Sequence, residues 1–111
     1  MLHEKLTAYQ ESIAMAEDVC KEVATWPKGF GYLADQIRRA MASVVLNEAE
    51  GNAKRSRLER RRFFETSRAS IAEVAACVDL ARVFGIMPPA RAASYKVRCE
   101  RISRMLWGMM K

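Results

Sequence analysis

The stretch LADQIRRAMASVVLNEAEG, residues 33–51, decides the fold of this chain of 111 residues. Its apolar residues Leu33, Ile37, Ala40 and Val44 recur at spacings of four, three and four, which is the period of one face of an α-helix. No glycine or proline interrupts the stretch before its last residue. Because a helix with one apolar face must bury that face, the stretch predicts an all-α protein in which this helix packs against others.

Three further segments repeat this pattern. Glycine and proline, which cost about 1 and 3 kcal/mol inside a helix, gather at residues 27–31, at Gly51, at residues 85–89 and at Gly108, so we expect the helices to lie between these positions. Ser56-Arg57-Leu58-Glu59 is a capping box that starts the third helix, and Gly85 supplies its left-handed end. The predicted apolar seam of the first helix is Leu2, Leu6, Tyr9, Ile13, Ala16, Cys20 and Val23. The predicted seam of the second helix is Phe30, Leu33, Ile37, Ala40 and Val44. The predicted seam of the third helix is Phe64, Ser67, Ile71, Val74, Val78 and Ala81. The predicted seam of the fourth helix is Tyr95, Cys99, Ile102, Leu106 and Met109.

The connections between these segments are short, so consecutive helices are expected to be antiparallel neighbours. The sequence therefore predicts an antiparallel up-down-up-down four-helix bundle. Residues 1–111 are expected to form one domain.

Charge favours a polyanionic partner. Lys and Arg number 19 against 13 Asp and Glu, which gives a formal net charge of +6. Residues 1–30 carry 3 basic and 5 acidic side chains, whereas residues 31–111 carry 16 and 8. An anion-binding face is therefore expected in the later part of the chain.

The residue types present argue against metal, disulfide and membrane functions. Three cysteines without a C-x-x-C pair and one histidine do not make a zinc site or a secreted disulfide framework. No apolar run approaches the roughly 20 residues of a membrane span. No nucleophile with a base and no glycine-rich phosphate loop is recognisable. We therefore expect a cytoplasmic protein that is not an enzyme and has no catalytic residues, metal or cofactor.

A polar stripe runs beside the apolar seam of residues 33–51. At 100° per residue it lies about 90° around the helix from that seam. The third helix carries a matching stripe with Thr66, Ser70, Glu73 and Cys77. Buried polar groups need partners, so we interpret these residues as a half-buried structural network that fixes helix register. Its predicted members are Gln36, Arg39, Ser43, Asn47, Glu50 and Glu73.

The densest charge lies at the start of the third helix. Residues 54–62 contain six basic side chains in nine, and free amides at a helix start also favour an anion. The predicted nucleic-acid-binding residues are Lys54, Arg55, Arg57, Arg60, Arg61, Arg62 and Arg68. The alternative is a solvated face in which Glu65 pairs with Arg61, Arg62 or Arg68. A second basic surface is expected on the fourth helix, from Arg91, Lys96, Arg98, Arg101 and Arg104.

The chain ends in Met105-Leu106-Trp107-Gly108-Met109-Met110, which is more apolar than one seam requires. Exposed apolar surface of this kind usually meets another chain. The alternative is that this end folds over the start of the first helix, at Leu2 and Leu6.

The run Leu33-x-x-Gln36-x-Arg38-Arg39-Ala40-x-x-Ser43-Val44-x-x-Asn47-x-Ala49-Glu50-Gly51, with Phe63-Phe64 and Ser70-x-x-Glu73 later, resembles the signature of the 23S rRNA-intervening-sequence proteins. The sequence departs from the family pattern at three positions. Glu48 stands where an apolar residue is usual, and Ser67 and Ala69 replace the usual Ala and Gly.

The resemblance implies a four-helix bundle that forms ring-shaped homopentamers, with no catalytic residues. A related branch, the accessory variability proteins of diversity-generating retroelements, binds nucleic acid and a reverse transcriptase through a basic surface. We therefore expect a non-enzymatic, oligomeric protein that associates with RNA or DNA. The alternative is a structural interaction module, such as an accessory subunit of a reverse transcriptase, without nucleic-acid binding of its own.

Overall fold

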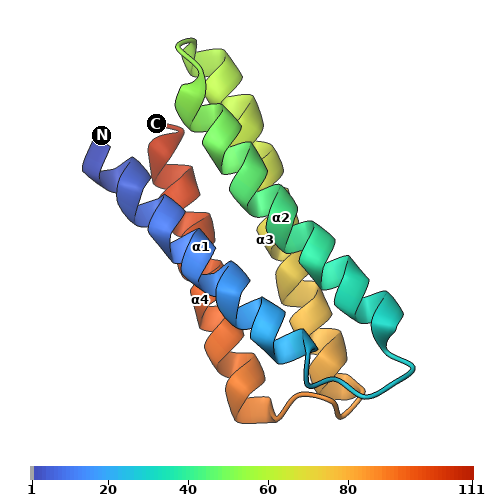
Figure 1. Ribbon diagram of the computed structural model, residues 1–111. Coiled ribbons are helices and arrows are strands. Elements are labelled where there is room, and N and C mark those ends of the chain that lie inside the picture. Colours follow the sequence, from blue (N-terminus) through green and yellow to red (C-terminus); the bar gives the residue numbers. More distant parts are fainter. Residues whose placement is uncertain (1) are drawn as a thin grey trace.

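The computed structural model describes residues 2–111 and contains four helices. They are α1 (Leu2–Val23), α2 (Gly31–Ala53), α3 (Arg57–Val83) and α4 (Pro89–Met109). Each runs antiparallel to the next, and the α2–α3 turn lies at the same end of the molecule as both chain ends (Figure 1). The predicted up-down-up-down four-helix bundle is confirmed.

The turn chemistry places the ends of α3. The Ser56 hydroxyl accepts a hydrogen bond from the Glu59 backbone N–H at 3.3 Å, as an N-cap residue does. Gly85 follows the helix with a φ of +76°, a left-handed conformation that glycine adopts without strain. Helix α2, in contrast, continues through Gly51 to Ala53, so the helix end predicted at Gly51 is wrong.

Gly51 instead permits close contact between two helices. A Cβ atom at this position would lie 2.6 Å from the ring of Phe64, which is fully buried in α3. Contacts that short do not occur without displacement of one group, so any larger residue would push α2 and α3 apart. The glycine is therefore explained by packing and not by a turn.

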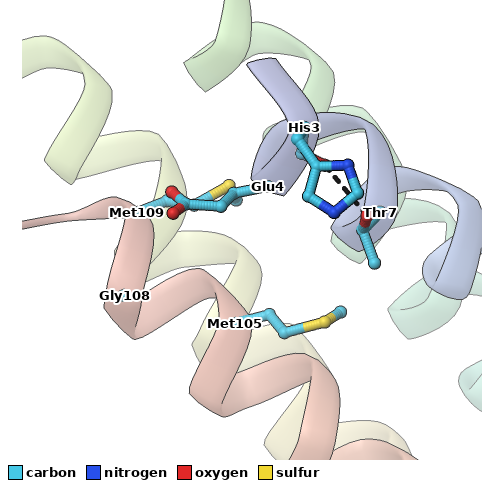
Figure 2. A pocket seen from close by; sticks show the side chains of 6 residues that line it. All are labelled: His3, Glu4, Thr7, Met105, Gly108 and Met109. Carbon is cyan, nitrogen blue, oxygen red and sulfur yellow. Dashed lines mark hydrogen bonds between the residues drawn. The ribbon is translucent and has the colours of Figure 1, made fainter. Parts of the chain in front are cut away.

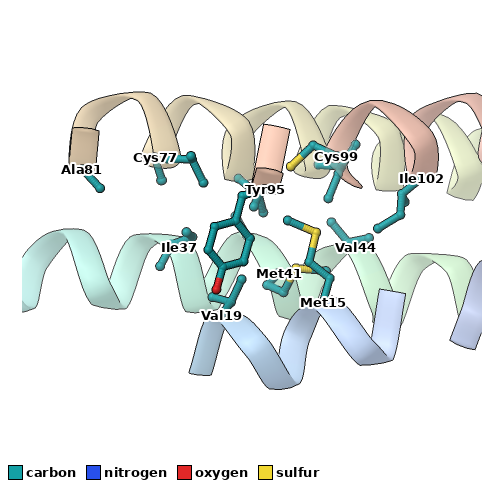
Figure 3. Packing of buried hydrophobic residues seen from close by; sticks show 14 of the residues in the cluster. Met15, Val19, Ile37, Met41, Val44, Cys77, Ala81, Tyr95, Cys99 and Ile102 are labelled. Atoms are coloured by element: carbon teal, nitrogen blue, oxygen red, sulfur yellow. The ribbon is translucent and has the colours of Figure 1, made fainter. Parts of the chain in front are cut away.

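The core lies between all four helices (Figure 3). The seams predicted for α2, α3 and α4 are confirmed, with Phe30 and Met109 at their ends only half-buried. Met15 and Val19 of α1 meet Met41 and Val44 of α2 in this core, and Tyr95 of α4 reaches in from the other side.

The predicted seam of α1 is wrong except at its last residue, Val23, which is buried. The buried residues of this helix are Ala8, Ser12, Met15, Val19, Glu22 and Val23, so the buried stripe lies one residue earlier, about 100° around the helix. Two polar residues, Ser12 and Glu22, belong to it because they have partners: Ser12 bonds to Glu48 of α2, and Glu22 pairs with Arg91 of α4 and accepts from Trp26 Nε1. Of the other predicted seam residues, Leu2, Leu6 and Ile13 are 79%, 53% and 41% exposed, Cys20 is exposed, and Tyr9 and Ala16 are half-buried.

Three ion pairs join α1 to α4. Glu22 pairs with Arg91 at 2.7 Å, Asp18 with Arg98 at 2.7 Å, and Glu11 with Arg101 at 3.0 Å. Acidic residues later in α1 pair with arginines earlier in α4, as expected for two antiparallel helices. We call these three pairs the ion-pair ladder. Three of the five acidic side chains in residues 1–30 therefore pair with arginines of the same chain.

The ion-pair ladder also corrects the second basic surface expected on α4. Arg91, Arg98 and Arg101 are paired with α1. Lys96 pairs with Asp79 of α3 at 2.9 Å, and Arg104 with Glu100 of its own helix at 3.4 Å. The sequence pattern missed this because the acidic partners, except Glu100, lie on other helices.

Among residues 2–111, no helix is both long enough and apolar enough to cross a membrane.

Candidate nucleic-acid interface

Four arginines at the start of α3 present their charge without acidic partners. Arg55, Arg57 and Arg62 are exposed and Arg61 is half-buried. Within residues 2–111 none of the four makes an ion pair, whereas eight of the other fifteen Lys and Arg side chains do. We call Arg55, Arg57, Arg61 and Arg62 the arginine cluster. It lies at the end of the bundle that carries the α2–α3 turn (Figure 1).

Two predicted binding residues in the same run have structural contacts. Arg60 Nη1 donates a hydrogen bond to the backbone carbonyl of Arg55 at 2.6 Å, which holds the turn against the first turn of α3. Lys54 Nζ lies 3.7 Å from a carboxylate oxygen of Glu50 and 5.3 Å from the centre of the Phe63 ring. These contacts hold in place the backbone of the residues that form the arginine cluster.

Arg68 lies away from the cluster, against α4. Its Nε donates to Ser103 Oγ at 3.2 Å, and its guanidinium lies 5.2 Å from the centre of the Trp107 ring. Among residues 2–111, Glu65 forms no ion pair with Arg61, Arg62 or Arg68. The structure therefore does not show the neutralised face that was the alternative to binding.

The helix start adds to the positive potential at this end. The backbone N–H groups in the first turn of α3 point toward the turn, and the helix dipole contributes a partial positive charge there. Since the Ser56 hydroxyl occupies only the N–H of Glu59, other amides of this turn remain able to face an anion. The arrangement suits negatively charged groups such as phosphates.

The polar stripe between α2 and α3 contains four of the six predicted network residues. Gln36 donates to Glu73, the Ser43 and Ser70 hydroxyls are 2.7 Å apart, and Asn47 donates to Ser43 Oγ at 3.0 Å. The first two contacts join α2 to α3, and the third lies within α2. Gln36 and Glu73 are exposed, so the network is half-buried only around Ser43, Asn47 and Ser70, and the prediction is wrong for its outer end.

Arg39 and Glu50 do not join this network, contrary to the prediction. Both are exposed, and Glu50 pairs with Lys54 instead. At 100° per residue, these two positions are turned further from the apolar seam than Gln36, Ser43 and Asn47. Replacement of Glu50 would therefore not leave a buried Lys or Arg side chain without its ion-pair partner.

Glu48 is a fully buried carboxylate that sequence reasoning did not place in the core. Its side chain is fully buried, and its Oε2 accepts a hydrogen bond from the Ser12 hydroxyl of α1 at 2.8 Å. Its Oε1 has no hydrogen-bond partner among the described residues. Burial raises the pKa of Glu48, and the Ser12 hydrogen bond only partly opposes this shift. The available signal was Glu48's departure from the family pattern at an apolar position.

Two cysteines share the core. Burial raises the pKa of Cys99 to about 11 and raises that of Cys77 as well, with the nearby Glu73 charge adding to the second shift. Both are therefore neutral thiols near pH 7 and poor nucleophiles. No group of three or more His, Cys, Asp or Glu residues that could hold a metal occurs in residues 2–111.

The apolar end of α4 is partly covered by its own chain. Leu106 and Met110 are buried, but Trp107 is 45% exposed. Met105 and Met109 face His3, Glu4 and Thr7 of α1 across a pocket of about 320 Å³ (Figure 2). Leu2 and Leu6 stay exposed, so the end of α4 does not fold over them.

Comparison with known proteins agrees with this architecture. Residues 4–108 match the family described as 23S rRNA-intervening sequence protein. No curated protein matches the chain.

One similar solved structure is a crystal structure of a protein with unknown function from the S23 ribosomal protein family of Bacteroides thetaiotaomicron. It superposes with a TM-score of 0.85 at 14% identity, over 96% of this chain and 97% of that one. Such low identity supports the shared fold alone. The match over residues 4–108, together with this fold, shows that the chain belongs to the 23S rRNA-intervening sequence protein family.

Proposed function

We propose that this protein is a non-enzymatic, oligomeric nucleic-acid-binding protein that holds the phosphate backbone with the arginine cluster. The single observation that carries the proposal is the set of four neighbouring arginines without acidic partners in residues 2–111. Arginine presents a planar fork of N–H donors that matches phosphate oxygens. The family's association with an intervening sequence of 23S rRNA makes RNA the first ligand to test.

The α1 surface supports the oligomeric part of the proposal. Leu2, Leu6 and Ile13 are exposed, and half-buried Tyr9 lies between them at spacings of three and four. A row of apolar residues at this spacing is typical of a helix that packs against another helix. We propose that a second copy of the chain covers this α1 stripe, and that the resulting closed ring is a homopentamer.

Light scattering at micromolar concentration tests this assembly. We expect a mass about five times the 12.6 kDa of the chain. Replacement of Leu6 and Ile13 by Gln is expected to reduce the mass to that of smaller species without unfolding the bundle, because neither residue is in the core. A monomeric wild type would contradict the assembly.

The backbone-binding role is tested by replacing Arg57, Arg61 and Arg62 with Gln. Affinity for structured RNA at low salt is expected to fall at least about tenfold, and by a similar factor for unrelated sequences, because backbone contacts carry no sequence information. Fluorescence anisotropy with labelled RNA hairpins measures the change. Thermal melts and light scattering should match those of the wild type, since these side chains are outside the core.

A matched control removes the same charge elsewhere. Lys28, Arg39 and Arg82 are exposed cations away from the α2–α3 turn, and their replacement by Gln should weaken binding much less. If both triple variants lose affinity equally, net charge and not the arginine cluster is responsible. If the wild type retains neither RNA nor DNA at low salt, the interaction-module alternative replaces the proposal, with the α1 stripe as its contact surface.

A further inference from the structure

A groove of about 630 Å³ lies between α2 and α3, directly beside the arginine cluster. Its α2 wall is formed by Asn47 and by Lys54, the residue that directly follows the helix. Its α3 wall includes Glu59, Arg62 and Thr66, and the half-buried ring of Phe63 lies between the walls. An aromatic ring, cations, carboxylates and an amide therefore border one cavity.

Backbone packing fixes the position of Phe63. A Cβ added at Gly51 would lie 3.2 Å from Phe63 Cβ, so Phe63 packs directly against Gly51 of α2. The Lys54 ammonium lies 5.3 Å from the ring centre. Lys54 has a flexible stem, so its ammonium can move from the ring to an incoming phosphate.

The mixed charge of the groove favours a nucleotide over a bare anion. Glu59 and Glu65 also line the cavity, and their carboxylates would repel a phosphate placed between them. A nucleobase offers amino or imino donors that pair with carboxylates, and an aromatic face that stacks on a side-chain ring. Its attached phosphates can then pair with Lys54 and Arg62, which also line the groove.

We propose that this groove binds one unpaired nucleotide of a single strand or loop, with the base stacked on Phe63. The proposal rests on the proposed function and deepens it. The arginine cluster holds backbone of any structure, whereas the groove selects nucleic acid that has a base free to leave its stack. Duplexes present no such base and use the arginine cluster alone.

The test compares single strands with a blunt duplex. Labelled single strands of about ten nucleotides, one RNA and one DNA of the same sequence, and the corresponding duplex are titrated against wild type and Phe63→Leu. We expect Phe63→Leu to weaken single-strand binding about 5- to 100-fold and to leave duplex binding unchanged. Phe63→Tyr, which keeps a stacking ring, should bind like the wild type.

Phe84→Leu is the matched control, because Phe84 is a 44% exposed aromatic residue at the other end of α3. It should change nothing. The RNA and DNA arms identify which strand type the groove prefers.

Two results would overturn the proposal. If Phe63→Leu binds single strands and duplex as the wild type does, the groove takes no base, while the backbone-binding function stands. If circular dichroism shows that Phe63→Leu is misfolded, an NMR titration of the wild type with the single strand decides instead. Stacking must shift the Phe63 ring protons upfield in an NMR titration with the single strand, and an unshifted ring rejects the groove. Absence of wild-type binding to all three ligands removes the proposed function itself.

Discussion

An increase in salt from about 50 to about 200 mM is expected to weaken the binding of structured RNA or duplex DNA by about 10³- to 10⁵-fold. The reason is that the proposed homopentamer would present several arginine clusters to the nucleic acid at once. If six to ten phosphates are neutralised, that number of contacts releases enough counterions to give such a slope. A single subunit would bind feebly, so avidity within the proposed ring would set the affinity.

The variant with Arg57, Arg61 and Arg62 replaced by Gln should flatten this slope, by about one unit for each phosphate contact that is lost. The slope is the gradient of log affinity against log salt, measured by anisotropy for both proteins. A steep wild-type slope that the variant retains would assign the phosphate contacts to other residues.

The second large effect concerns the buried acid. Ser12→Ala should destabilise the bundle by about 1–3 kcal/mol, because it removes the hydrogen bond that the Glu48 carboxyl accepts and leaves both of its oxygens buried without a partner. Glu48→Gln keeps the shape of the side chain and an oxygen that accepts from Ser12, but it cannot ionise. At neutral pH we expect Glu48→Gln to be more stable than the wild type.

The direction of the pH dependence follows from the raised pKa of Glu48. The folded protein binds this proton more tightly than the unfolded chain does. The resulting stabilisation is complete below the unfolded-state pKa of about 4.3 and is lost as pH rises through the folded-state pKa. The stability advantage of Glu48→Gln should therefore grow with pH across this interval.

Urea denaturation at a series of pH values measures this difference. Glu50→Gln, the same change at an exposed position two residues along α2, is the control and should alter stability by no more than about 0.5 kcal/mol. If Glu48→Gln and the wild type keep a constant difference in unfolding free energy at every pH, the Glu48 carboxyl is not the group that titrates.

The sequence predicted three of the four buried seams because their buried residues are almost all apolar and follow the helical period. It failed on α1, where the more apolar stripe is exposed. Ser12 and Glu22 are buried there because Glu48 lies on α2 and Arg91 on α4. No local pattern contains those partners, which are 36 and 69 residues away.

The candidate site shows the same division. The basic run could be located from composition and the capping box alone. The separation of Arg60 and Arg68 from the arginine cluster could not, because it depends on the path of the turn and on Ser103 and Trp107 of α4. The groove at Phe63 depends on how closely Gly51 lets α2 approach α3, which only the packed structure reveals.

The measurement that tests nucleic-acid binding at this end of the bundle most directly is an NMR titration of the isotope-labelled protein with structured RNA. The largest changes in backbone amide shifts are predicted for residues 54–66, which contain the α2–α3 turn and the arginine cluster. Residues 24–30 and 84–88, in the loops at the opposite end, should stay unshifted. If the largest changes instead fall in those loops or along α4, the arginine cluster is not the nucleic-acid interface.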